Sequence, residues 1–158
     1  MDGKKIIVVS ILLSSTFAFP NGGPIDACVK SNPNVPNHSG ISPQPIETLP
    51  FAVEQSSEAY GPRDVIKVKI SGLPFKGFFI QARDAKTGDW IGSFDESYAS
   101  KSYDECSAAT HTYNDPKNQI ELIWRAPDNR RGGVYFTGTV VENYKTFWSG
   151  IVSYPSQY

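Results

Sequence analysis

The stretch from residue 72 to residue 83 constrains the fold of this chain more than any other. It begins with the turn signal Gly-Leu-Pro and continues, from residue 77, as Gly-Phe-Phe-Ile-Gln-Ala-Arg, with almost no polar interruption. Successive side chains of a strand point to opposite faces, so Phe78, Ile80 and Ala82 share one face, and Phe79, Gln81 and Arg83 share the other. We expect the first face to be buried, which places this strand at the centre of a core.

Three further runs alternate apolar and polar side chains, the pattern of a half-buried antiparallel strand. They cover residues 65–70, 119–125 and 134–142. Other strands are expected at residues 51–53, 90–94, 108–113 and 147–153, and residues 84–89 are expected to form the hairpin loop before residue 90. Residues 95–105 are polar, and we expect a long loop there. The side chains expected to form a core between two sheets are Phe78, Ile80, Val68, Leu122, Trp124 and Phe136.

These segments amount to about seven or eight short strands separated by turns, with no amphipathic helix of useful length. The sequence therefore predicts an all-β fold, an immunoglobulin-like antiparallel β-sandwich, with a closed barrel as the alternative.

The N-terminal residues have the pattern of a secretory signal. Lys4 and Lys5 precede the apolar residues 6–17, and residues 16–18 form a small-x-small type of cleavage site. Twelve apolar-biased residues are fewer than the roughly 20 that a bilayer span requires, so we expect no membrane span. The sequence predicts a signal peptide at 1–18 and a secreted, extracellular, single domain at 19–158.

Six prolines lie between residues 21 and 50, and they disfavour both helix and continuous sheet pairing. We expect residues 19–50 to form an extended Pro-rich arm and residues 51–154 to form the sandwich. Asn37-His38-Ser39 in the arm is an N-glycosylation acceptor sequence, which is compatible with exposure in a secreted chain. The alternative is an unoccupied sequon.

Cys28 and Cys106 are the only two cysteines. In an oxidising compartment they are expected to form one disulfide that ties the arm to the middle of the chain. The alternative is two free thiols. No Cys/His cluster has zinc spacing, and we expect neither a metal nor a cofactor.

Charge and residue types exclude some functions. The net charge is −1 at pH 7, whereas dedicated nucleic-acid binders usually carry a strongly basic surface, so no nucleic-acid partner is expected. Neither His38 nor His111 lies in a recognisable nucleophile context, and the sequence therefore predicts a protein that is not an enzyme. His111 is expected to be a packed structural residue. A small secreted hydrolase is a weaker alternative, because the separation of paired carboxylates is a spatial property.

One hairpin loop carries a cluster of arginines. Arg125, Arg130 and Arg131 lie at or near the turn of residues 126–133, and guanidinium groups suit phosphate and carboxylate partners. This loop is the candidate contact for an anionic ligand; the alternative, a merely solvated loop, is the more usual outcome for an isolated charge cluster. Trp90, Trp124 and Trp148 could stack on a ligand, but buried aromatic side chains mostly belong to the core.

Several separate motifs resemble those of the reeler (reelin-type) domain, in order and spacing, from about residue 27 to residue 153. They are Cys28 with Pro36-Asn37-His38; Tyr60-Gly61-Pro62; Phe75-Lys76-Gly77-Phe78 with Gln81-Ala82-Arg83; Gly92-Ser93-Phe94; Cys106 with Thr110-His111; Trp124-Arg125-Ala126-Pro127; and Gly133-Val134-Tyr135-Phe136 leading to Phe147-Trp148.

A signal peptide followed by one such domain is similar to the insect defence proteins, a family of secreted single-reeler proteins that includes noduler. The resemblance implies a role in innate immunity, with antimicrobial activity or binding to microbial surface components, such as lipopolysaccharide or glucan, or to haemocytes. The alternative is an extracellular matrix or cell-surface interaction module without an immune role. A monomer is expected.

Overall fold

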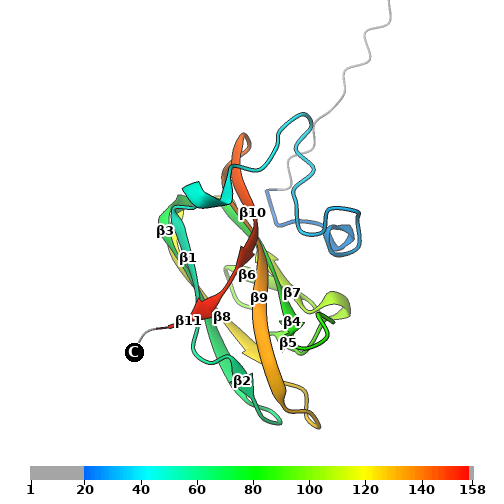
Figure 1. Cartoon of the computed structure of the whole chain (residues 1–158). Coiled ribbons are helices and arrows are strands. Elements are labelled where there is room, and N and C mark those ends of the chain that lie inside the picture. The colour runs from blue at the N-terminus through cyan, green and yellow to red at the C-terminus, as the bar shows by residue number, and fades with distance from the viewer. Residues whose placement is uncertain (1–19, 157–158) are drawn as a thin grey trace, which may run out of the picture.

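The computed structural model describes residues 20–156, which form two packed β-sheets (Figure 1). The predicted signal peptide at 1–18 and the mature N-terminus at Phe19 lie outside the described residues. Eleven strands are present in the described part of the chain, compared with the seven or eight expected. The additional strands are mostly two residues long, and such short segments carry no alternation signal.

The first sheet has five strands, in the order β11 (Tyr154–Pro155), β1 (Phe51–Gln55), β3 (Val65–Phe75), β8 (Lys117–Arg125) and β5 (Ser93–Phe94). The second sheet has the order β10 (Thr146–Val152), β9 (Gly132–Asn143), β4 (Gly77–Asp84), β7 (Ala108–His111) and β6 (Ser100–Tyr103), with β2 (Ala59–Tyr60) paired to the start of β9. The pairings between these strands are antiparallel except for the parallel pair β1 and β11. The predicted antiparallel β-sandwich is therefore confirmed.

The main core lies between the two sheets. All six side chains expected there are buried in one continuous apolar cluster. Trp124 has no exposed surface, packs edge-on against Phe136, and donates its indole N–H to the carbonyl of Ile91 over 2.9 Å. An indole donor that is buried needs such a partner, so the hydrogen bond fixes the ring in the core.

The outer face of β4 is also buried, which the alternation pattern did not indicate. Phe79 is 5% exposed and Gln81 is fully buried, although both point away from the main core. Phe79 belongs to a second apolar cluster with Ala27, Cys28 and Ala108. The N-terminal arm supplies two of these residues, so it is the arm that covers the outer face of the second sheet.

Two sequence-based expectations about local structure were wrong. Residues 84–89 turn the chain back beside the end of β4 as expected, but in the segment 90–94 only β5 is a regular strand, and it pairs with β8 in the other sheet. Trp90 makes only an isolated bridge to Arg83. The expected loop at 95–105 contains β6 and a 3₁₀ turn, η3 (Asp104–Cys106). β6 is an edge strand held by backbone pairing to β7, so its sequence, Ser-Lys-Ser-Tyr, shows no regular apolar alternation.

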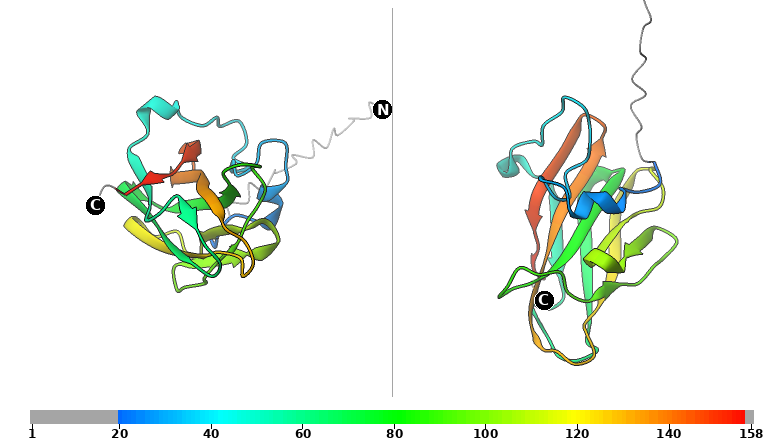
Figure 2. Two further views of the ribbon diagram at one scale, coloured as in Figure 1. Left: turned by 60° about the horizontal axis from the view of Figure 1, so that its bottom comes forward. Right: turned by 90° about the vertical axis from the view of Figure 1, so that its right-hand side faces the viewer.

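The arm is closely associated with the sandwich. It contains two 3₁₀ turns, η1 (Ile25–Cys28) and η2 (Ile46–Thr48), and runs along one side of the sandwich and over its end before entering β1 (Figures 1 and 2). Near η2, the indole N–H of Trp148 donates to Thr48 Oγ1 over 3.0 Å. Within residues 20–156, no helix is long and apolar enough to cross a bilayer.

Candidate functional site

The arm is fixed to the second sheet by a disulfide. Cys28, in η1, is bonded to Cys106, in η3, with their Cα atoms 6.3 Å apart and both side chains almost completely buried. The expected bridge is therefore present, and it holds the start of the arm beside β7.

Polar contacts hold the arm on either side of this bridge. Asn34 donates its side-chain amide to Gln81 Oε1 over 2.9 Å, and Gln81 in turn donates to the carbonyl of Cys106 over 3.1 Å. The hydroxyl of Tyr103 donates to the carbonyl of Gly23, whose own N–H donates to Thr110 Oγ1. These hydrogen bonds tie the arm to β4, β6 and β7 on either side of the bridge.

A cavity of about 290 Å³ lies between the arm and the outer face of the second sheet. Its floor includes Gly77 and Phe79 of β4 and Thr139 and Val141 of β9. Its other walls come from the arm, from the turn between β9 and β10, and from β7 and the residues after it, and they include Pro24, Ala27, Asn34, Val35, Pro36, His38, Tyr144 and His111. We call this space the arm cavity.

His38 forms part of the arm wall. Its ring stacks on Tyr144 with a centroid separation of 4.3 Å and meets Phe147 edge-on at 5.5 Å. Burial, with a smaller contribution from the charge of Lys30, lowers the pKa of His38, against the opposing effect of a hydrogen bond to the Tyr144 backbone. The imidazole is therefore neutral at pH 7. Its Nδ1 atom is buried and has no hydrogen-bond partner.

His111, the other histidine, lines the same cavity from β7. It is buried as expected, and its Nδ1 accepts the backbone N–H of Phe78 over 3.3 Å. The ring lies directly on the backbone of Gly77, where a Cβ atom would come within 2.7 Å of it. A glycine is needed at this position to admit the ring.

Sequence reasoning treated the two histidines separately and missed their shared cavity. His38 follows Cys28 by ten residues and His111 follows Cys106 by five, so the disulfide brings the two segments together. The predicted bridge was thus the one signal in the sequence that could have brought them together. Across residues 20–156 no group of three or more His, Cys, Asp or Glu side chains is arranged to hold a metal ion.

The three arginines expected to contact an anion are not equivalent. Arg125 forms a two-pronged ion pair with Asp95, with N–O distances of 2.6 and 2.7 Å. This pairing, through its hydrogen bond, lowers the pKa of Asp95. Arg125 is therefore already matched to a carboxylate, which reduces its availability to a ligand.

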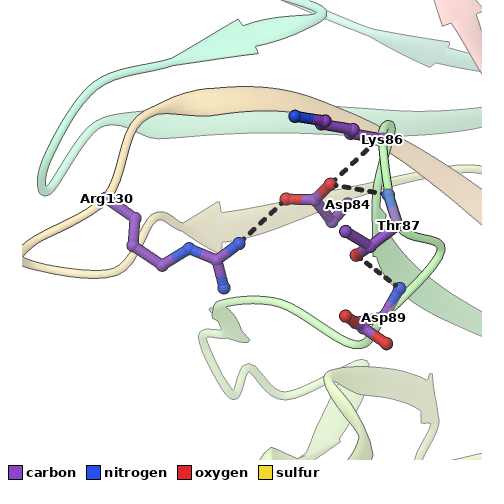
Figure 3. A network of polar contacts seen from close by, with 5 residues as sticks. All are labelled: Asp84, Lys86, Thr87, Asp89 and Arg130. Carbon is purple, nitrogen blue, oxygen red and sulfur yellow. Dashed lines mark hydrogen bonds and ion pairs between the residues drawn. The ribbon is translucent and has the colours of Figure 1, made fainter.

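Arg130 contacts a different carboxylate, that of Asp84, with an N–O distance of 3.1 Å (Figure 3). Asp84 also accepts the backbone N–H groups of Lys86 and Thr87, and these bonds are the first cause of its lowered pKa. Arg131 is exposed and makes no ion pair with any residue of the described chain. Anion binding by this loop stays a prediction. Of its arginines, Arg131 is the most available to a ligand, because it makes no ion pair within the described chain.

The other candidate positions are placed as follows. Asn37 is exposed on the arm at the edge of the arm cavity, and its glycosylation stays a prediction. Trp124 and Trp148 are buried, as is usual for core aromatic residues. Trp90 is partly exposed, and the guanidinium of Arg83 lies 5.6 Å from its ring centre.

Comparisons with known proteins give two kinds of relatives. "Putative defense protein 3" of Antheraea mylitta is 33% identical over 95% of this chain and 93% of its own length. "Putative defense protein 2" of the same organism is 30% identical over 90% of this chain and 92% of its own length. "Ferric-chelate reductase 1" of Mus musculus is 33% identical over 96% of this chain. The chain spans only about a quarter of the length of that reductase, 27%.

The solved structure of the human F-spondin reeler domain has a similar fold. It superposes with a TM-score of 0.55 at 18% identity and covers 68% of this chain and 89% of its own. The family model described as "Reeler domain" matches residues 26–157, which is most of the chain. The chain therefore belongs to the Reeler domain family.

Proposed function

We propose that this protein is a secreted defence protein that binds a component of microbial surfaces and catalyses no reaction of its own. One observation carries the proposal: the chain matches two proteins named as defense proteins almost from end to end, at 33% and 30% identity. In those relatives the Reeler domain accounts for nearly the whole protein, so the named role belongs to a domain of this size.

Secretion is supported by the pattern of residues 1–18 and by the buried Cys28–Cys106 disulfide. Disulfides of this structural kind persist in oxidising compartments such as the exterior of the cell. The absence of a catalytic role is supported by the histidines. His38 is stacked on Tyr144, and His111 is held against the β4 backbone. The hydroxyl of Thr110 lies 3.3 Å from His111 Nδ1, but it is buried and donates to the carbonyl of Phe78 over 2.7 Å, so it is not free to act as a nucleophile.

For the contact with an anionic surface we propose the loop between β8 and β9. Arg130 and Arg131 are both exposed there, and only Arg130 has a partner in the described chain, Asp84. Lipopolysaccharide carries phosphates, which guanidinium groups bind well, whereas a neutral glucan would need stacked aromatic side chains instead. Binding through exposed charges weakens as salt rises, because the Debye length is about 8 Å at physiological ionic strength.

The test measures binding of the purified protein to lipopolysaccharide and to β-glucan at low and high salt. The variant is Arg130→Ala/Arg131→Ala, and the matched control is Lys145→Ala, which removes a charge from an exposed loop at another place in the chain. We expect the double variant to lose lipopolysaccharide affinity at low salt and the control to retain it. Equal lipopolysaccharide affinity of wild type and the double variant, with no salt dependence, would exclude the loop from the binding site.

A second candidate is an extracellular interaction module without an immune role. The ferric-chelate reductase relatives favour it, because there the matched region is only part of a much longer protein. A pull-down comparing bacteria and haemocytes with matrix extract separates the two candidates. Retention by matrix alone would support the second candidate, and turnover in a hydrolase screen would contradict the absence of catalysis.

A further inference from the structure

We propose that the arm cavity is a binding site for a small, uncharged molecule with an apolar ring body and one hydroxyl group. This site is separate from the arginine loop, and the inference does not depend on the proposed defence function.

The size of the cavity sets the size of the ligand. An engineered protein cavity of about 150 Å³ binds benzene. The arm cavity, with about 290 Å³, has room for a body of about two fused rings. It also lies just below the range of roughly 300 to 1,000 Å³ that is usual for small-molecule sites.

The walls favour an uncharged ligand body. Pro24, Val35, Pro36, Phe79 and Val141 provide apolar surface. Among the lining residues, Lys76 is the only one with a formal charge at neutral pH, and it is exposed. No lining residue is a carboxylate, so a cationic ligand would have no counter-charge. Burial of an apolar body against such walls stabilises the complex by removing apolar surface from water.

Two buried acceptors in the cavity walls lack a hydrogen-bond donor. They are Nδ1 of His38 and Oδ1 of Asn34, and Asn34 is only 7% exposed. The amide nitrogen of Asn34 already donates to Gln81. In neutral His38 one ring nitrogen donates and the other accepts, so Nδ1 is an acceptor in the tautomer that carries its proton on Nε2. A buried acceptor without a donor is destabilising, so a ligand hydroxyl that donates a hydrogen bond to one of these atoms would stabilise the complex.

Both acceptor atoms have almost no surface open to a water-sized probe, from the cavity or from outside, so a ligand O–H reaches them only after a side chain turns. We therefore expect binding to shift the His38 ring relative to Tyr144, on which it stacks. The disulfide and the Asn34–Gln81 hydrogen bond hold the arm in place while the ring shifts.

The experiment compares three probes of one size: 2-naphthol, naphthalene and 2-naphthoate. Binding to the full secreted chain is followed by NMR chemical-shift changes and by titration calorimetry. His38→Phe keeps a ring that can stack on Tyr144 but removes the acceptor. Val141→Phe places a ring in the cavity, and Val152→Phe makes the same change on an exposed face of β10 that does not line it.

We expect 2-naphthol to bind wild type at least about tenfold more tightly than naphthalene, since a free energy of 1.4 kcal/mol corresponds to a factor of ten. His38→Phe should remove that advantage and leave naphthalene binding unchanged. Val141→Phe should abolish binding of both, and Val152→Phe should leave both intact.

Four results would overturn the proposal. The first is no 2-naphthol binding at millimolar concentration, and the second is equal binding by wild type and Val141→Phe. The third is tighter binding of 2-naphthoate than of 2-naphthol, which would assign the site to anions through Lys76. His38 and Tyr144 NMR signals that do not move on binding would contradict the location.

Discussion

Truncating Phe79 to alanine tests directly whether the arm covers the second sheet. Phe79 is 5% exposed, its ring stacks on that of Tyr103 at 6.2 Å, and it lies against Gly23, where an added Cβ would come within 2.9 Å. The neighbouring residue, Phe78, is 1% exposed and points into the main core, so Phe78→Ala is a matched comparison on the same strand.

The magnitudes follow from what surrounds each ring. Phe→Ala changes in a core cost about 3 to 5 kcal/mol, which combines lost transfer free energy with the cavity that remains. Phe78 lies between two sheets, which cannot close on the cavity that its removal leaves, so we expect Phe78→Ala to cost about 3 to 5 kcal/mol. One wall around Phe79 is the arm, which can move inward, so we expect about 2 to 3 kcal/mol. For a domain of this size, that loss lowers the melting temperature by roughly 6 to 15 °C.

The assay is urea unfolding followed by tryptophan fluorescence, with thermal unfolding as a second measurement. Repeating Phe79→Ala in a variant that lacks both cysteines gives a double-mutant cycle. In that variant Phe79→Ala should lower the free energy of unfolding by less, because the disulfide no longer holds the arm against β4. A loss below about 1 kcal/mol for Phe79→Ala, the size expected of a surface site, would refute the packing of the arm on β4. If Phe79→Ala lowers the free energy of unfolding by the same amount with and without the disulfide, the bridge does not hold the arm on β4.

Three further predictions concern the cavity and its bridge. Replacing Cys28 and Cys106 by alanine should lower the free energy of unfolding by about 2 to 4.5 kcal/mol, because the bridge closes a long loop, and peptide mapping without reductant should show the pair joined. Acidification through pH 6.5 should destabilise wild type more than His38→Phe, because the unfolded chain takes up the proton before the folded His38, whose pKa is lowered. Parallel slopes of stability against pH in the two proteins would contradict this. Gly77→Ala should cost about 1 to 3 kcal/mol in urea unfolding by displacing the ring of His111, and an unchanged His111 NMR signal would show that the ring tolerates the methyl group.

The local pattern of the sequence was sufficient for the sandwich and its core. Alternation in residues 65–70 and 119–125 assigned Val68, Leu122 and Trp124 to inner faces, and all three are buried there. Alternation works because successive side chains of a strand must point to opposite faces, whatever the strand pairs with. The two cysteines likewise were sufficient for the bridge, since no other pairing within the chain exists.

Pairing partners and the second buried face were decided only by the tertiary structure. Nothing near Phe94 indicates that β5 joins β8, and nothing near Phe79 indicates that a proline-rich arm covers it. The arm cavity depends on contacts between residues far apart in sequence, such as Asn34 with Gln81 and His38 with Tyr144. Such contacts form only when the disulfide and the sheet bring distant segments together, so no local pattern encodes them.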